Sequence, residues 1–381
     1  MGARKRLGVI FSYDVQWIGG TYYTINLIES FNSLEEEQRP EVVVFSNEAD
    51  FSRLRKEVKY PYLSYELLTE KPLSHWKIVI NKFFYRVFKR KVITNTYKGF
   101  LHALFLFQNC GFLESIPMKR RIYWIADFQD KRLPHFFSKE GLEQKDKKSK
   151  WIGLNAHTLI LSSQAVFDDW KYFYPEYKCN VKVVHFAVTH SKYEHISMQD
   201  LRHRYNLPVV YFFAPNQFWA HKNHIVVIKA AEELKKAGIP VFVAFSGKEN
   251  DNRNPGYTEG LKEYVSKNQL GDVVRFLGFL DRAEQLQLMK HARAIIQPSK
   301  FEGWSTVIED AMAMNQPVIA SDLRVNEEQL GDLGVYFKQD DYQDLSNCII
   351  NFSEMKPEVN YNYSKRVQDF ATNLISLSEN D

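Results

Sequence analysis

Short apolar runs alternate with segments of helical periodicity along most of the chain, and this alternation constrains the fold more than any other feature. Two of the runs, residues 7–12 and 209–214, are almost continuously apolar, which is typical of strands buried on both faces of a parallel sheet. Strand–helix alternation predicts parallel α/β sheets. At 381 residues, the chain is long enough for two to three domains of about 150 residues each.

The runs fall into two series. The first series predicts strands at residues 7–12, 41–45, 60–65, 121–125 and 158–162. The second series predicts strands at residues 209–214, 241–245, 273–277, 294–297 and 317–320. We therefore expect two Rossmann-like, doubly wound α/β domains facing a cleft. The predicted ranges are 1–188 and 189–360, followed by a C-terminal segment, 361–381, whose helix at 363–376 returns to the first domain.

Charge is distributed unevenly between the two halves. Residues 1–150 contain 26 Lys and Arg against 17 Asp and Glu, while residues 151–381 contain 24 against 29. The basic half could face an anionic membrane, an anionic acceptor or nucleic acid. The stretch 75–91 mixes aromatic and basic residues, so we expect either a helix at a membrane interface or a buried helix with a basic outer face. No recognition motif favours nucleic acid.

Cysteine usage and hydropathy predict a cytoplasmic protein. Three scattered cysteines form neither a zinc spacing nor a disulfide framework, which fits a reducing compartment. The basic N-terminus leads directly into a short strand-like run, so no signal peptide is expected. The richest apolar run, residues 100–113, is too short and too polar to span a bilayer. The cysteines are Cys110, Cys179 and Cys348.

The segment 301–313 is the strongest candidate for chemistry. It follows the expected strand 294–297 and opens a helix. Thr306 and Glu309 have the spacing of a capping box, which predicts Thr306 as the N-cap and Glu309 as its partner. The free amides at this helix start would suit a phosphate, and Glu302 lies just before them.

Three further loops carry unusual residues. Lys222, in the loop after strand 209–214, suits a diphosphate. Gly19 and Gly20 follow the first strand and permit close approach of a ligand to the backbone. Asp127 and Asp130 follow the strand at 121–125, and either could face the cleft.

Segment 301–313 resembles the donor-binding signature of retaining nucleotide-sugar glycosyltransferases of glycosyltransferase family 4, which have the GT-B fold. In that family two acids are separated by seven residues, the first beside the donor sugar and the second on the ribose hydroxyls. Glu302 matches the first acid. Alignment on residues 311–313 places the second at Asp310, whereas a spacing of six places it at Glu309. Lys222 matches a family lysine, and the family's arginine falls on a neutral amide, Asn216 or Gln217.

The resemblance implies a retaining, metal-independent transfer of a sugar from a nucleoside diphosphate to a glycan or polyprenyl-linked acceptor, in surface polysaccharide assembly at the inner face of the membrane. It implies no cofactor, and the sequence has no D-x-D or His/Cys spacing for a metal. The alternatives are a catalytically silent binding subunit on the same fold and, less favoured, a nucleotide-sugar epimerase. The implied catalytic residues are Glu302, Lys222 and Asp127. The implied donor-binding residues are Gly19, Gly20, Asn216, Gln217, Lys222, Gly247, Phe279, Leu280, Gly303, Trp304, Ser305, Thr306 and Asp310.

Overall fold

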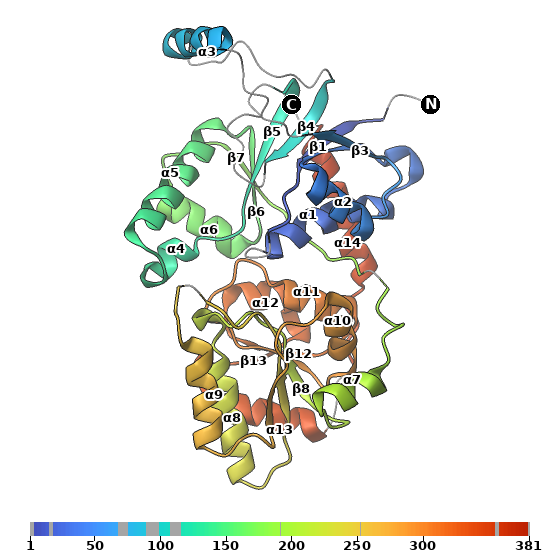
Figure 1. Ribbon diagram of the computed structural model, residues 1–381, viewed down its shortest axis with the longest axis vertical. Helices are drawn as coiled ribbons and strands as arrows, with labels where there is room; N and C mark the ends of the chain where they lie inside the picture. The colour runs from blue at the N-terminus through green and yellow to red at the C-terminus, as the bar shows by residue number, and fades with distance from the viewer. Residues whose placement is uncertain are drawn as a thin grey trace.

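The computed structural model contains two parallel β-sheets, each covered by helices (Figure 1). The structure describes residues 4–14, 18–67, 75–88, 99–106, 116–190, 192–251, 253–354 and 358–379. Cys110 and residues 89–91 of the stretch 75–91 lie outside these ranges. Cys179 and Cys348 are free thiols.

The first sheet has seven strands in the order β3-β2-β1-β4-β5-β6-β7. Its strands are β1 (Arg6–Ile10), β2 (Glu41–Ser46), β3 (Leu63–Leu67), β4 (Leu101–Leu106), β5 (Met118–Ile125), β6 (Thr158–Leu161) and β7 (Asn180–Val183). The helices of this part are α1 (Ile18–Ser30), α2 (Glu48–Glu57), α3 (His75–Phe88), α4 (Gln129–Arg132), α5 (Lys139–Asn155) and α6 (Gln164–Phe173). The described strands all pair in parallel.

The second sheet has six strands in the order β10-β9-β8-β11-β12-β13, again all parallel. Its strands are β8 (Phe212–Ala214), β9 (Val243–Phe245), β10 (Val274–Phe276), β11 (Ile295–Gln297), β12 (Val318–Ser321) and β13 (Val335–Phe337). The remaining helices are α7 (Met198–Tyr205), α8 (His224–Lys236), α9 (Tyr257–Lys267), α10 (Arg282–His291), α11 (Thr306–Ala313), α12 (Arg324–Leu330), α13 (Tyr342–Glu354) and α14 (Tyr363–Ser376). In both sheets the first strand lies in the interior, as in a doubly wound fold. The predicted fold class is confirmed.

Strands β4, β7 and β13 were not predicted. β4 is fully internal, between β1 and β5, yet its sequence contains His102. The backbone N–H of Arg6 donates to His102 Nδ1 over 3.1 Å, so a neighbouring strand satisfies this polar side chain. The polar residue His102 therefore kept the local sequence from indicating that β4 is a central strand.

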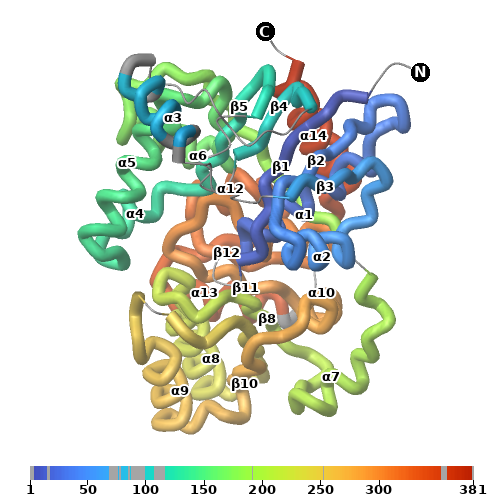
Figure 2. Tube along the Cα trace, turned by 45° about the horizontal axis from the view of Figure 1, so that its top comes forward, coloured from blue at the N-terminus to red at the C-terminus, as the bar shows by residue number. Residues whose placement is uncertain are grey.

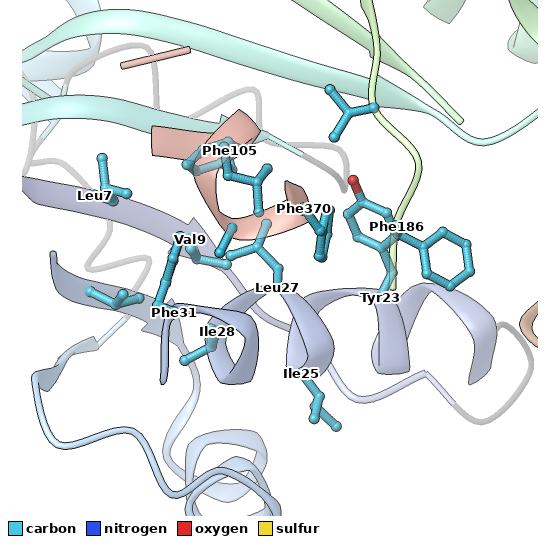
Figure 3. Close-up of a cluster of buried hydrophobic side chains, with 14 of the residues drawn as sticks. Leu7, Val9, Tyr23, Ile25, Leu27, Ile28, Phe31, Phe105, Phe186 and Phe370 are labelled. Atoms are coloured by element: carbon cyan, nitrogen blue, oxygen red, sulfur yellow. The ribbon is translucent and has the colours of Figure 1, made fainter. Parts of the chain in front are cut away.

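Alternate residues of the strands face two hydrophobic cores. Leu7 and Val9 of β1 face one side of the first sheet, whereas Ile10 faces the other, because successive side chains of a strand point in opposite directions. Figure 3 shows the first of these cores, in which Phe370 of α14 lies beside Tyr23 and Leu27 of α1. The C-terminal helix thus packs onto the part of the molecule that contains the N-terminus (Figure 2).

Polar contacts join the two parts of the molecule. Glu328 of α12 accepts hydrogen bonds from the backbone N–H groups of Gln164 and Ala165, over 2.7 and 3.2 Å. These two residues open α6, so a carboxylate from the second part lies at the positive end of a helix in the first. Arg324 of α12 also pairs with Asp168 of α6, over 2.9 Å. None of the described helices is both long enough and apolar enough to cross a membrane.

Candidate active site

The candidate site lies at the carboxyl ends of β8 and β11. β8 pairs with β9 on one side and with β11 on the other. This is the point at which the strand order of the second sheet reverses, and in open α/β sheets ligands bind outside the strands there. The loops that follow β8 and β11 contain Lys222 and Glu302.

Lys222 and Glu302 form an ion pair. Lys222 Nζ lies 2.5 Å from Glu302 Oε1, and both side chains are largely buried, at 14% and 9% exposed. Gln297, the last residue of β11, also donates from Nε2 to Glu302 Oε1, over 2.7 Å. Two donors therefore fix one carboxylate oxygen of Glu302, which orients this acid at the end of the sheet.

Asp127 approaches the same loop from the first part of the molecule. A Cβ atom on Gly303 would lie 2.2 Å from the carbonyl oxygen of Ala126 and 2.7 Å from Asp127 Cβ. Only glycine fits at position 303, and the loops from the two sheets touch here. Burial raises the pKa of Asp127, and the Glu302 carboxylate adds to this effect. The structure thus brings the three predicted catalytic residues, Glu302, Lys222 and Asp127, together.

Helix α11 starts differently from the capping box that the sequence predicted. Ser305, rather than Thr306, is the N-cap, and its Oγ accepts from the backbone N–H of Ile308 over 3.3 Å. The backbone N–H of Ser305 donates to Gln329 Oε1. Among the described residues, the amides of Thr306 and Val307 have no hydrogen-bond partner. The helix start therefore keeps two amides for an anion.

Glu309 is a buried structural acid, not the partner of a cap. Its carboxylate accepts from Trp304 Nε1 over 2.9 Å and from Gln329 Nε2 over 2.8 Å. It also binds the Tyr363 hydroxyl and, over 3.2 Å, Arg366. Glu309 therefore links α11 to α12 and to the C-terminal helix α14.

Asp310 is bound by two residues that the sequence analysis did not identify. Both of its oxygens accept from Arg282, one of them over 2.7 Å, and His190 Nε2 lies 3.0 Å from Oδ1. Burial alone would raise the pKa of Asp310, but Arg282 and His190 outweigh it and hold the pKa below its usual value. Arg282 also lies over the Tyr22 ring, 5.2 Å from its centroid. Since Tyr22 follows Gly19 and Gly20 in the first turns of α1, Arg282 connects that glycine pair to Asp310.

Other predicted donor residues occupy varied places. Gly247 has a φ of +155°, and a Cβ there would lie 2.2 Å from the carbonyl oxygen of Asn216, so the glycine permits close packing of the loops after β8 and β9. Gln217 Oε1 accepts from the backbone N–H of Lys248. Phe279 is exposed, whereas Leu280 is buried in a core cluster. Their contacts with a donor stay predictions.

Trp304 holds the two parts of the molecule together. Its ring stacks on His185, with centroids 4.2 Å apart, and its Nε1 donates to the carbonyl oxygen of Phe186 over 3.2 Å.

In the described ranges, no group of three or more His, Cys, Asp or Glu side chains is placed to hold a metal ion.

Comparison with known proteins assigns the part of the chain that contains Lys222 and Glu302. Residues 201–370 match a family model described as "Glycosyl transferases group 1". Residues 201–370 belong to the group 1 glycosyltransferases. The sequence resemblance implied the GT-B fold. Solved glycosyltransferase structures have the same two-sheet fold as this chain.

Two curated proteins match parts of this chain. The O-antigen chain mannosyltransferase RfbU of Salmonella typhimurium (strain LT2) is 30% identical over 145 residues, which are 38% of this chain and 39% of that protein. The putative glycosyltransferase EpsF of Bacillus subtilis (strain 168) is 33% identical over 106 residues, 28% of this chain and 26% of that protein. The chain thus matches well under half the length of either relative.

A solved structure matches over nearly the whole chain. Anabaena Alr3699/HepE, in complex with UDP and glucose, has a TM-score of 0.64 and 18% identity, and the match covers 98% of this chain and 94% of that one. At this identity the likeness establishes the fold alone.

Proposed function

We propose that this protein is a retaining, metal-independent glycosyltransferase that moves a sugar from a nucleoside-diphosphate sugar to a glycan or lipid-linked acceptor. The carrying observation is the Lys222–Glu302 ion pair at the switch point of the second sheet, with Asp127 of the first part beside Gly303. Lys222 and the amides of Thr306 and Val307 would stabilise the departing diphosphate. Glu302 would lie beside the sugar.

Surface polysaccharide assembly is the proposed process. Its support is the match to a curated O-antigen chain mannosyltransferase over 145 residues. A thermal-shift panel of UDP-, GDP- and dTDP-sugars tests the proposal, because a ligand that binds the folded state raises its apparent stability. We expect one nucleotide sugar to raise the Tm more than its diphosphate alone; a panel without any stabilising member would contradict the proposal.

A silent nucleotide-sugar-binding subunit is the second candidate. The observation that favours it is Asp310, whose two oxygens are bound by Arg282 and His190 instead of being open to a ribose. This candidate predicts stabilisation by a nucleotide sugar with neither transfer nor hydrolysis. Product analysis therefore separates the two functions.

Lys222→Ala should weaken nucleoside-diphosphate binding by about 1.5–3 kcal/mol, the usual contribution of a charge-assisted hydrogen bond. Isothermal calorimetry with the diphosphate of the stabilising donor measures this change. Lys236→Ala is the matched control, because Lys236 ends the helix that begins just after Lys222 and its side chain is 72% exposed. Equal affinities of Lys222→Ala and the wild type would place the diphosphate elsewhere.

Helix α3 supports a proposed peripheral membrane contact. It lies at the end of the first part that is remote from the second sheet (Figure 1). Trp76, Val79, Ile80 and Phe83 are 77%, 44%, 39% and 61% exposed. Their spacing places them on one face of the helix, and exposed apolar groups on one face do not fit the alternative of a buried helix. Lys82 and Arg86 are exposed on the same helix, so we propose that α3 lies in an anionic membrane interface.

The double substitution Trp76→Ser/Phe83→Ser should weaken binding to vesicles of phosphatidylethanolamine and phosphatidylglycerol by at least about tenfold, because two large apolar side chains no longer enter the interface. Co-sedimentation measures the bound fraction. Leu154→Ser, at an exposed apolar side chain of α5, is the control. Binding that survives the double substitution would exclude α3 as the contact.

A further inference from the structure

Three buried polar residues lie at the carboxyl ends of three consecutive strands of the second sheet, β9, β8 and β11. Asn216 follows β8, Ser246 follows β9 and Gln297 ends β11; they are 2%, 1% and 0% exposed. The strand register pairs Ala214 with Phe245, so Ser246 and Asn216 continue two neighbouring strands. β11 lies on the other side of β8, which brings Gln297 to the same edge.

These side chains have polar atoms that the rest of the protein leaves unpaired. Among the described residues, neither Oδ1 nor Nδ2 of Asn216, nor Ser246 Oγ, nor Gln297 Oε1 has a hydrogen-bond partner. Buried polar groups nearly always have partners in folded proteins. Four unpaired atoms at one strand edge therefore indicate a site that a polar ligand completes.

Gln329 provides a contrast within the same part of the molecule. It is also a buried glutamine, but its Oε1 accepts from the Ser305 amide and its Nε2 donates to Glu309 and to the Ser305 carbonyl oxygen. Its side chain stabilises the fold. By comparison, Gln297 uses Nε2 on Glu302 and Ser299 while its carbonyl oxygen stays unpaired.

The chemistry of the unpaired atoms defines the class of ligand. None of the three side chains is charged, and acceptor oxygens outnumber donors. A phosphodiester oxygen only accepts, so a diphosphate could use Asn216 Nδ2 and the Ser246 hydroxyl but would leave the two carbonyl oxygens, Asn216 Oδ1 and Gln297 Oε1, without a donor. Hydroxyl groups both donate and accept, so they match the set. Gln297 also binds Glu302, which places the set beside the proposed catalytic acid.

We propose that Asn216, Ser246 and Gln297 form a neutral subsite for the hydroxyl groups of the donor sugar. The proposal rests on the proposed function, which it deepens by separating recognition of the sugar from recognition of the diphosphate. Lys222 and the start of α11 hold the diphosphate. The neutral amide of Asn216, one of the two positions at which the resemblance implies an arginine, holds the sugar.

The test compares nucleotide sugars with plain diphosphates by calorimetry. The probes are UDP-glucose against UDP and GDP-mannose against GDP, and the variants are Asn216→Leu and Ser246→Ala. We expect each variant to bind the nucleotide sugar about 3- to 10-fold more weakly, the size of a lost neutral hydrogen bond. Affinity for the plain diphosphate should stay within about twofold of the wild type.

The Tm of each variant separates a ligand-binding role from a structural role. Loss of a ligand-binding side chain leaves the Tm unchanged or raises it, whereas loss of a structural side chain lowers it. Asn216→Leu and Ser246→Ala remove unpaired atoms, so the Tm should stay unchanged or rise. Gln329→Met, which removes paired atoms, should lower it. Asn216→Ala replaces Asn216→Leu if the larger side chain prevents folding.

Each other outcome overturns the subsite. An equal loss for diphosphate and nucleotide sugar would assign Asn216 to the diphosphate, and a Tm that falls as in Gln329→Met would make the residues structural. Unchanged affinity for a nucleotide sugar that the wild type binds would remove the subsite and leave the proposed function intact. A wild type that binds none of the four probes would overturn the subsite, and the wider thermal-shift panel then decides the proposed function separately.

Discussion

Glu302→Gln is expected to lower kcat by about 10²-fold or more, the effect of removing one preorganised electrostatic group. In the structure, Lys222 and Gln297 fix one oxygen of this carboxylate. A fixed negative charge beside the sugar would stabilise positive charge that develops as the glycosidic bond breaks. Because this interaction grows toward the transition state, the loss should fall on kcat more than on donor affinity. Release of nucleoside diphosphate from the stabilising donor measures kcat.

The control for this variant is Glu259→Gln, at an exposed residue of α9. EDTA should leave the wild-type rate unchanged, since Lys222 and the helix amides carry the proposed charge stabilisation. Activity that disappears with EDTA and returns with Mn²⁺ would show that this charge stabilisation is assigned to the wrong group. A Glu302→Gln variant with the wild-type kcat would remove Glu302 from the reaction.

Glu309→Gln is expected to lower the free energy of unfolding by about 3–5 kcal/mol, the usual cost of breaking a buried charge network. Trp304, Gln329, Tyr363 and Arg366 all donate to this carboxylate. In glutamine an NH2 group, which only donates, replaces one of the two carboxylate oxygens. At least one of the four donating groups therefore loses its partner. Urea unfolding monitored by tryptophan fluorescence measures the change.

Glu327→Gln, at an exposed acid of the neighbouring helix α12, should change stability by no more than about 0.5 kcal/mol. A Glu309→Gln variant as stable as the wild type would contradict the linking role of this acid. Glu309 would then have only the minor role of a capping partner, as the sequence predicted. The hydrogen bonds at the start of α11 do not support that role.

The two-sheet architecture could be predicted because its signals are local. Buried parallel strands such as β1 and β2 consist mostly of apolar residues, and α8 and α14 have apolar residues at helical spacing. β4 escaped prediction because His102 interrupts its apolar run, and the partner of His102 comes from β1. A polar residue in a central strand can be recognised only when its distant partner is known.

The site shows the same division between local and distant information. Glu302 and Lys222 were identified from motifs, and the structure adds that they meet across 80 positions of the chain. His190 and Arg282 have no motif of their own, and only the fold brings them to Asp310. The start of α11 was misplaced by one residue, because both Ser305 and Thr306 can cap a helix and the adjoining Glu309 completed an apparent capping box.

Proton NMR of the sugar released or transferred in the first minutes of reaction tests the central claim most directly. The wild type is mixed with the nucleotide sugar that raises its Tm most, with water or a soluble glycoside as acceptor. We predict a product with the anomeric configuration of the donor, formed by the wild type and at least about 10²-fold more slowly by Glu302→Gln. An inverted product would contradict the retaining mechanism, and a tightly bound donor that gives no product would contradict the assignment as an enzyme.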